Sequence, residues 1–200
     1  MGIGFMRLKV KVNKKVIFWL FVGLVVLPMT CGLCQDKGSD FSDLVPYVTT
    51  PPAVIQEILQ LAEVTSEDVL YDLGSGDGRI PIAAARQFGI RALGVEIDAE
   101  LVNEANENAQ IAGVSDLVTF VQGDLFAMDL SEATVLVLYL FPDINLKLRP
   151  RILQLEPGTR VISHRFDMGD WEPEETRKIV MEDGAEHVIF LWRVTGEEDF

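Results

Sequence analysis

The chain has 200 residues, of which 48% are hydrophobic, so it can bury the core of one ordinary domain. Five of its 17 Lys and Arg residues, but none of its 31 Asp and Glu residues, lie in residues 1–35, which leaves a net charge of −19 on the remainder. A body this acidic repels phosphate backbones and argues against DNA or RNA as a partner.

Residues 1–35 form a basic and hydrophobic leader. No residue from Val16 to Cys34 is charged, and this stretch is long enough to be either part of a signal peptide or a membrane anchor. Lysines ahead of it would keep the amino end inside and direct the body outward. We expect membrane association through this segment; the alternatives are export, or a cytoplasmic location if translation starts later, for example at Met29.

Residues 36–44 are a polar linker, and the folded domain is expected to span residues 45–200. Its first helix should follow Thr50 as N-cap, with Pro51 at the first helical position. An apolar strand over residues 68–73 leads to a helix over residues 79–88 that Gly89 ends. A strand over residues 91–97 is followed by a helix that Asp98 caps and Gly113 ends.

Apolar runs over residues 117–122, 133–140 and 159–164 predict further strands, with a helix over residues 145–154 between the last two. Residues 176–181 and 187–194 predict an antiparallel hairpin through Asp183 and Gly184. Continuous apolar strands that alternate with helices are typical of a parallel sheet covered on both faces. We therefore predict a doubly wound, Rossmann-like α/β fold with a mostly parallel sheet and a C-terminal antiparallel hairpin.

A glycine-rich turn, in the sequence YDLGSGDGR, lies between the first predicted strand and its helix. Gly74 and Gly76 let the backbone turn sharply and approach a ligand at the carboxyl end of the strand, where ligands bind in such sheets. Asp72 and Asp77 would repel a pyrophosphate and attract a cation. The turn therefore favours a cationic ligand without phosphate.

Two more acids stand at predicted strand ends. Glu96 is placed to accept hydrogen bonds from both ribose hydroxyls, and Asp124 from an adenine amine, although Glu96 could instead cap a helix and Asp124 could be a turn residue. S-adenosylmethionine, which combines a sulfonium, an ammonium and an adenosine, matches this arrangement. The predicted cofactor-binding residues are Tyr71, Asp72, Gly74, Ser75, Gly76, Asp77, Glu96, Ile97, Asp124 and Leu125.

The motifs DLGSGDGR, GVEID, QGDL and SHRFDMGDWEP together resemble those of class I S-adenosylmethionine-dependent methyltransferases. The chain looks most like the protein-lysine methyltransferases that act on the adenine nucleotide translocase and on ATP synthase subunit c. The resemblance covers residues 45–192. It implies a seven-stranded sheet, S-adenosylmethionine as cofactor, lysine amines as acceptors and a hydrophobic segment ahead of the catalytic domain.

A lysine acceptor must lose a proton before it attacks, so catalytic candidates are sought after the fourth and fifth strands. The candidates are Tyr139, His164 and Asp167. His164 is either a base or, as the favoured alternative, a structural hydrogen-bonding partner of a neighbouring loop, and Trp171 either walls the acceptor channel or covers the sheet edge. The sequence YLFP lacks the amide or acid with which base methyltransferases hold an amine, which counts against a nucleobase.

The predicted function is N-methylation of a lysine in a protein, with a membrane protein as one candidate acceptor and no metal site. The alternatives are methylation of a small molecule or lipid, an NAD-dependent oxidoreductase and a non-catalytic nucleoside-binding module. Arg79 occupies the position where the dinucleotide fingerprint has glycine or alanine, which disfavours the oxidoreductase.

Overall fold

The computed structural model describes residues 48–196. The predictions for the leader and the linker, residues 1–44, therefore lie outside the described residues. Within residues 48–196, every helix is too short or too polar to cross a bilayer.

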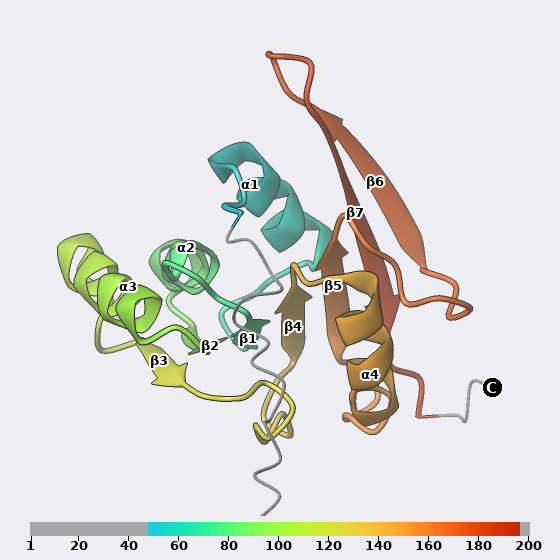
Figure 1. Cartoon of the computed structure of the whole chain (residues 1–200), viewed down its shortest axis with the longest axis horizontal. Coiled ribbons are helices and arrows are strands. Elements are labelled where there is room, and N and C mark those ends of the chain that lie inside the picture. The colour runs from blue at the N-terminus through green and yellow to red at the C-terminus, as the bar shows by residue number, and fades with distance from the viewer. Residues whose placement is uncertain (1–47, 197–200) are drawn as a thin grey trace, which may run out of the picture. The chain divides into compact units, whose positions relative to one another are not determined.

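The described strands form one mixed sheet with the order β3-β2-β1-β4-β5-β7-β6 (Figure 1). Its parallel strands are β1 (Val69–Leu73), β2 (Arg91–Glu96), β3 (Val118–Gln122), β4 (Val135–Leu138) and β5 (Arg160–His164). The last two strands, β6 (Glu175–Val180) and β7 (Glu186–Arg193), pair antiparallel, and β7 also pairs antiparallel with β5. The predicted seven-stranded, mostly parallel sheet with a C-terminal hairpin is confirmed.

Helices cover both faces of this sheet. On one face lie α1 (Pro52–Leu61), α2 (Arg79–Phe88) and α3 (Ala99–Ala112), whereas α4 (Pro142–Ile152) lies on the other (Figure 1). Two hydrophobic clusters result because successive side chains of a strand point to opposite faces. In β1, Leu70 belongs to the cluster under α1, α2 and α3, and Leu73 to the cluster under α4.

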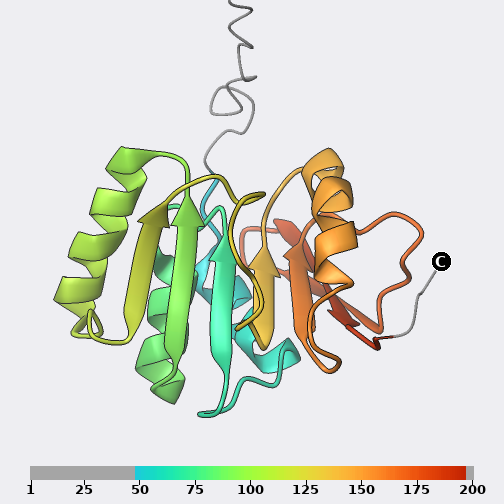
Figure 2. The same ribbon diagram turned by 90° about the horizontal axis from the view of Figure 1, so that it is seen from below.

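The chain order of the strands creates a switch point beside β1. Figure 2 shows the parallel strands side by side and pointing the same way. After β1 the chain builds β2 and β3 on one side, and then returns to add β4 on the other. Ligands of open α/β sheets bind outside the carboxyl ends of the strands at such a point, and the glycine-rich turn after β1 lies there.

Most helix ends agree with the sequence signals. Gly89 and Gly113 end α2 and α3 in the left-handed conformation, and the Asp98 side chain accepts the backbone N–H of Glu100 at the start of α3. The prediction for α1 is wrong by one residue, because its N-cap is Pro51 and not Thr50. A residue that precedes proline disfavours the helical conformation, so Pro51 is extended and the helix begins at the second proline.

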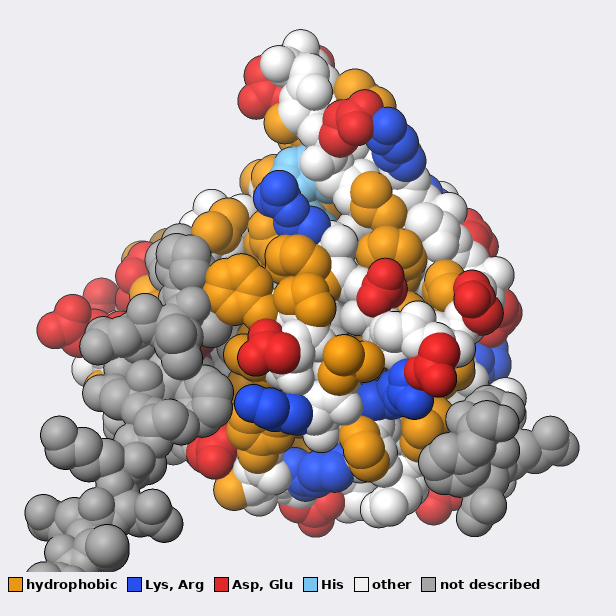
Figure 3. Space-filling model, turned by 45° about the vertical axis from the view of Figure 1, so that its right-hand side comes forward, with side chains coloured by type: hydrophobic (Ala, Val, Ile, Leu, Met, Phe, Trp, Pro, Cys, Tyr) orange, Lys and Arg blue, Asp and Glu red, His pale blue; other side chains and the backbone are white. Residues whose placement is uncertain are grey.

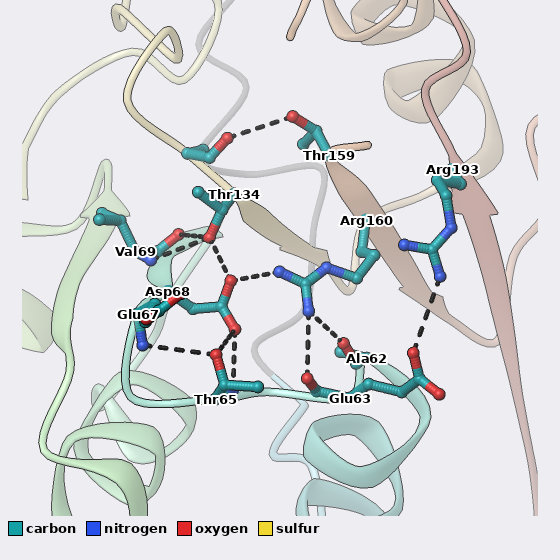
Figure 4. A network of polar contacts seen from close by, with 11 residues as sticks. Ala62, Glu63, Thr65, Glu67, Asp68, Val69, Thr134, Thr159, Arg160 and Arg193 are labelled. Carbon is teal, nitrogen blue, oxygen red and sulfur yellow. Dashed lines mark hydrogen bonds and ion pairs between the residues drawn. The ribbon is translucent and has the colours of Figure 1, made fainter. Parts of the chain in front are cut away.

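The amino ends of β1, β4 and β5 are tied together by a buried polar network (Figure 4). Asp68 accepts hydrogen bonds from the Thr134 hydroxyl at 2.7 Å and the Thr65 backbone N–H at 2.8 Å, and it pairs with the Arg160 guanidinium, which also donates to the carbonyl of Ala62. Burial raises the pKa of Asp68, but the hydrogen bonds outweigh it and the net shift is downward. This network stabilises the sheet at the end opposite the glycine-rich turn.

Candidate active site

A cavity of about 370 Å³ opens at the carboxyl ends of the parallel strands. Nine of the ten predicted cofactor-binding residues line it: Asp72, Gly74, Ser75, Gly76, Asp77, Glu96, Ile97, Asp124 and Leu125. Tyr71 does not. Since side chains alternate along β1, Tyr71 points to the face that α4 covers and packs in the hydrophobic cluster there.

The glycines of the turn have different functions. Gly74 and Gly76 line the cavity and have positive φ angles of 79° and 54°. Gly78 has a φ of 78° and is the N-cap of α2, and a Cβ atom on it would lie 2.4 Å from Cζ of Phe120 in β3. The first two glycines bring the backbone to the cavity, whereas the third allows helix α2 to pack closely on the sheet.

Asp72 is the buried acid of the cavity. Its side chain is 3% exposed, and no hydrogen bond from the described residues reaches its carboxylate. Burial, together with the negative charges of Glu96 and Asp77, raises the pKa of Asp72 to about 8. A buried carboxylate without a partner is costly, and a cationic group in the cavity would remove this cost. This feature fits the ammonium and sulfonium of S-adenosylmethionine.

Glu96 fixes the backbone around the cavity. Its Oε2 accepts the N–H of Gly76 at 2.9 Å, and its Oε1 accepts the N–H groups of Ile97 and Asp98 at 2.8 and 3.1 Å. Because a carboxylate offers about four acceptor sites, about one remains for a ligand. To accept hydrogen bonds from both ribose hydroxyls, as predicted, Glu96 would have to lose one of its hydrogen bonds to the backbone.

The charge of Asp77 is compensated within the turn, which the sequence analysis missed. Its carboxylate pairs with Arg79 at 2.6 Å, and Arg79 also donates to the backbone carbonyl of Thr50 at 3.1 Å. The pair therefore ties residues 48–50, which also line the cavity, to the glycine-rich turn. The attraction for a cation predicted for two carboxylates comes chiefly from Asp72.

One side of the cavity is apolar and suits a flat ring. Ile97, Leu101, Leu125 and Phe126 line it, next to the Asp124 carboxylate. Asp124 accepts the N–H of Phe126 at 2.8 Å and so shapes this wall. Leu101 and Phe126 were not predicted from the sequence, because neither residue carries a chemical signal apart from its position in the fold.

Arg151, on α4, forms hydrogen bonds to the backbone of the same wall. Its guanidinium donates to the backbone carbonyls of Phe126 and Met128, and to that of Leu125 at 3.4 Å. These residues follow β3 in a loop, and a loop without such bonds would be free to move away from the cavity. Arg151 is therefore a positioning residue for the wall.

The three catalytic candidates do not share one environment. Tyr139 lines the cavity, and its ring packs on that of His164 with a centroid distance of 4.0 Å. His164 is fully buried beneath it, and burial lowers its pKa to about 4, so the ring is neutral. Asp167 is exposed, does not line the cavity and accepts the N–H of Gly169.

Trp171 packs against β7 and does not line the cavity. Its ring lies 5.8 Å from that of Trp192 in β7, and its carbonyl accepts the Trp192 indole N–H at 2.7 Å. The cavity is walled near Tyr139 by residues that the sequence analysis did not select, Val48, Thr49 and Thr50.

Comparisons with known proteins agree with this geometry. The family model for the ANTKMT methyltransferase domain matches residues 72–175. A protein-lysine N-methyltransferase from Saccharolobus islandicus is 44% identical over 76% of this chain and 95% of its own length. The mouse adenine nucleotide translocase lysine N-methyltransferase is 35% identical over 64% of this chain, which spans 56% of that enzyme.

The solved structures include a near relative. The crystal structure of an RNA methyltransferase from Salinibacter ruber in complex with S-adenosyl-L-homocysteine has 54% sequence identity and a TM-score of 0.70. It covers 76% of this chain, and the match includes 98% of the Salinibacter chain.

Proposed function

The chain belongs to the ANTKMT methyltransferase domain family, and we propose that it transfers a methyl group to the side-chain amine of a lysine in a protein. It is a methyltransferase that uses S-adenosylmethionine. The Asp72 carboxylate is buried in the cavity and has no hydrogen-bonding partner among residues 48–196, and this observation carries the cofactor assignment. The relative named for protein-lysine methylation supports the acceptor.

The chain's residues have two tasks, to align the reactants and to promote loss of a proton from the acceptor. S-adenosylmethionine supplies a methyl group that its sulfonium already activates. A lysine with a pKa of about 10.4 must reach its neutral form near pH 7, at a cost of about 5 kcal/mol. Asp72 and the backbone around Gly74 and Gly76 would hold the amino-acid part of the cofactor, and Tyr139 borders the acceptor side.

A protein is favoured over RNA as the acceptor by charge. Residues 36–200 carry a net charge of −19, which repels a phosphate backbone and attracts a lysine-bearing segment. RNA is the second candidate, because the Salinibacter relative is described as an RNA methyltransferase.

Labelling of extracts tests the acceptor class. Cells from which the gene is deleted are extracted, and the extract is incubated with the full chain and tritiated-methyl S-adenosylmethionine. We expect label that protease removes and ribonuclease leaves in place, and no label with the Asp72→Ala variant. Label that ribonuclease removes would make RNA the acceptor, and label that partitions into organic solvent would make it a lipid.

We also propose that the chain associates with membranes through the segment between Val16 and Cys34, whose lack of charge supports this. Fractionation of cells with an antibody against the body is the test. We expect to recover the full-length chain in the membrane pellet. A chain that lacks residues 1–35 should remain in the soluble fraction. Equal solubility of both forms would contradict it.

A further inference from the structure

Three segments that are distant in the sequence meet behind the acceptor side of the cavity. They are the segment before α1, which carries Thr50, the end of β5, which carries His164, and the start of β7, which carries His187. The Thr50 Oγ1 atom lies 3.4 Å from Nδ1 of His164, and Nε2 of His164 lies 2.9 Å from Nδ1 of His187. These are the only two histidines of the chain.

The three side chains form a continuous path with one end at the cavity and the other at the surface. Thr50 lines the cavity, and His164 is fully buried and does not line it. The Tyr139 ring covers His164 on the cavity side, so the Thr50 hydroxyl is the described group that joins His164 to the cavity. His187 is partly exposed, and Figure 3 shows a histidine side chain at the molecular surface.

The chemistry of the three groups suits proton transfer. A hydroxyl both donates and accepts, and a neutral imidazole donates from one nitrogen and accepts at the other. The contact between the two histidines needs one donor and one acceptor, so it shares one proton. When Thr50 donates to Nδ1 of His164, Nε2–H of His164 donates to His187, and every bond in the path points toward the surface.

We propose that Thr50, His164 and His187 form a path that carries the proton of the acceptor amine from the cavity to water. This role rests on the proposed function, since it requires an ammonium that loses a proton. The amine N–H bond breaks as Thr50 takes that proton and passes its own to Nδ1 of His164. Nε2–H of His164 then passes to His187, which releases the proton of its other nitrogen to water.

The protons of the two rings return to their starting positions between turnovers. After the release both rings are neutral but carry their protons on the opposite nitrogens. Once the product has left and water fills the cavity, one proton that passes back along the path into that water restores both tautomers. No oxidant or second substrate is needed, and the substrate proton ends in bulk water.

The environment keeps His164 neutral at rest. Burial, followed by the neighbouring His187 and Arg165, disfavours a charge on His164 and lowers its pKa to about 4. The groups that face His164 are Tyr139 from the end of β4, Thr50 from the segment before α1 and His187 from β7. A proton on His164 is therefore short-lived. This suits a group that passes protons on and does not suit one that stores them.

Single-turnover rates measured against pH test the path, with poly-L-lysine as the acceptor and saturating S-adenosylmethionine. We expect Thr50→Val and His187→Phe each to lower the rate at pH 7 by about a hundredfold, the low end of what positioned proton transfer contributes. The deficit should shrink about tenfold per pH unit and disappear near about pH 9, because a growing share of the amine, whose pKa is about 10.4, then arrives neutral. Thr50→Ser should restore most of the rate lost in Thr50→Val, and 4-methylimidazole in the buffer should partly restore His187→Ala.

Controls separate this role from a structural one. Thr176→Val makes the same change on an exposed position of β6 and should leave the rate unaltered. The affinity of each variant for S-adenosylhomocysteine, by calorimetry, should equal that of the wild type. A deficit that is the same at every pH, or no deficit, would overturn the path. If the wild-type chain labels neither poly-L-lysine nor any extract protein, the proposed function fails and the path fails with it.

Discussion

Replacing Asp72 with asparagine should stabilise the ligand-free protein while it weakens cofactor binding. In the folded chain the pKa of Asp72 is about 8, against an ordinary value of 3.8. Between these two values the folded state holds a proton that the unfolded state has lost, so the free energy of unfolding falls as the pH rises. At about 1.36 kcal/mol per pH unit, the loss at pH 7 is about 4 kcal/mol.

The assay is urea unfolding of the wild type and Asp72→Asn from pH 4 to pH 9. The variant lacks the ionisation, so its advantage should grow from near zero at pH 4 to about 4 kcal/mol at pH 7 and level off above pH 8. Titration with S-adenosylmethionine completes the test. As the pH rises toward 8, the affinity of the wild type should increase about tenfold per pH unit, because the cation binds the ionised carboxylate. The affinity of the variant should be lower and should not change with pH. Equal stability of the two proteins at pH 7, together with a flat wild-type affinity, would refute the reasoning.

Other substitutions test the groups that support the cavity. Gly78→Ala should destabilise the fold by about 2 kcal/mol or more, because φ is positive there and the new methyl group would collide with Phe120; thermal unfolding measures it. Asp68→Asn should cost about 3 kcal/mol in chemical unfolding, because the half-buried Arg160 guanidinium loses its carboxylate partner, and it should leave cofactor affinity unchanged in calorimetry. Arg151→Met should lower cofactor affinity about tenfold, since the lost hydrogen bonds are worth about 1.5 to 3 kcal/mol, and unaltered affinity would remove Arg151 from the site.

Much of the fold could be predicted because its signals are local. The caps of α3 at Asp98 and Gly113 depend on residues within one turn of the helix, and the predicted boundaries agree with the structure. Asp72 was assigned to the cavity because a strand that runs into a glycine-rich turn delivers its last residues to the sheet edge. These predictions needed no knowledge of distant contacts.

The features that could not be predicted depend on tertiary contacts or on neighbouring charges. The contact between His164 and His187 forms only because β7 pairs with β5, and nothing near either residue in the sequence indicates it. Likewise, the hydrogen bond from the N–H of Gly76 to Glu96 joins residues 20 positions apart, and the sequence did not indicate it; the contact of Glu96 with the ribose hydroxyls stays a prediction. The ion pair between Asp77 and Arg79 was open to prediction from the sequence, and only its consequence for the charge of the cavity was missed.

The most direct measurement of the central claim is the chemical identity of the labelled product. Protein labelled with the tritiated methyl donor by the full-length chain is hydrolysed in acid, and the radioactive amino acids are separated against standards. We expect the tritium to elute with mono-, di- or trimethyllysine. Tritium recovered only in methylated nucleosides or in another amino acid would contradict it.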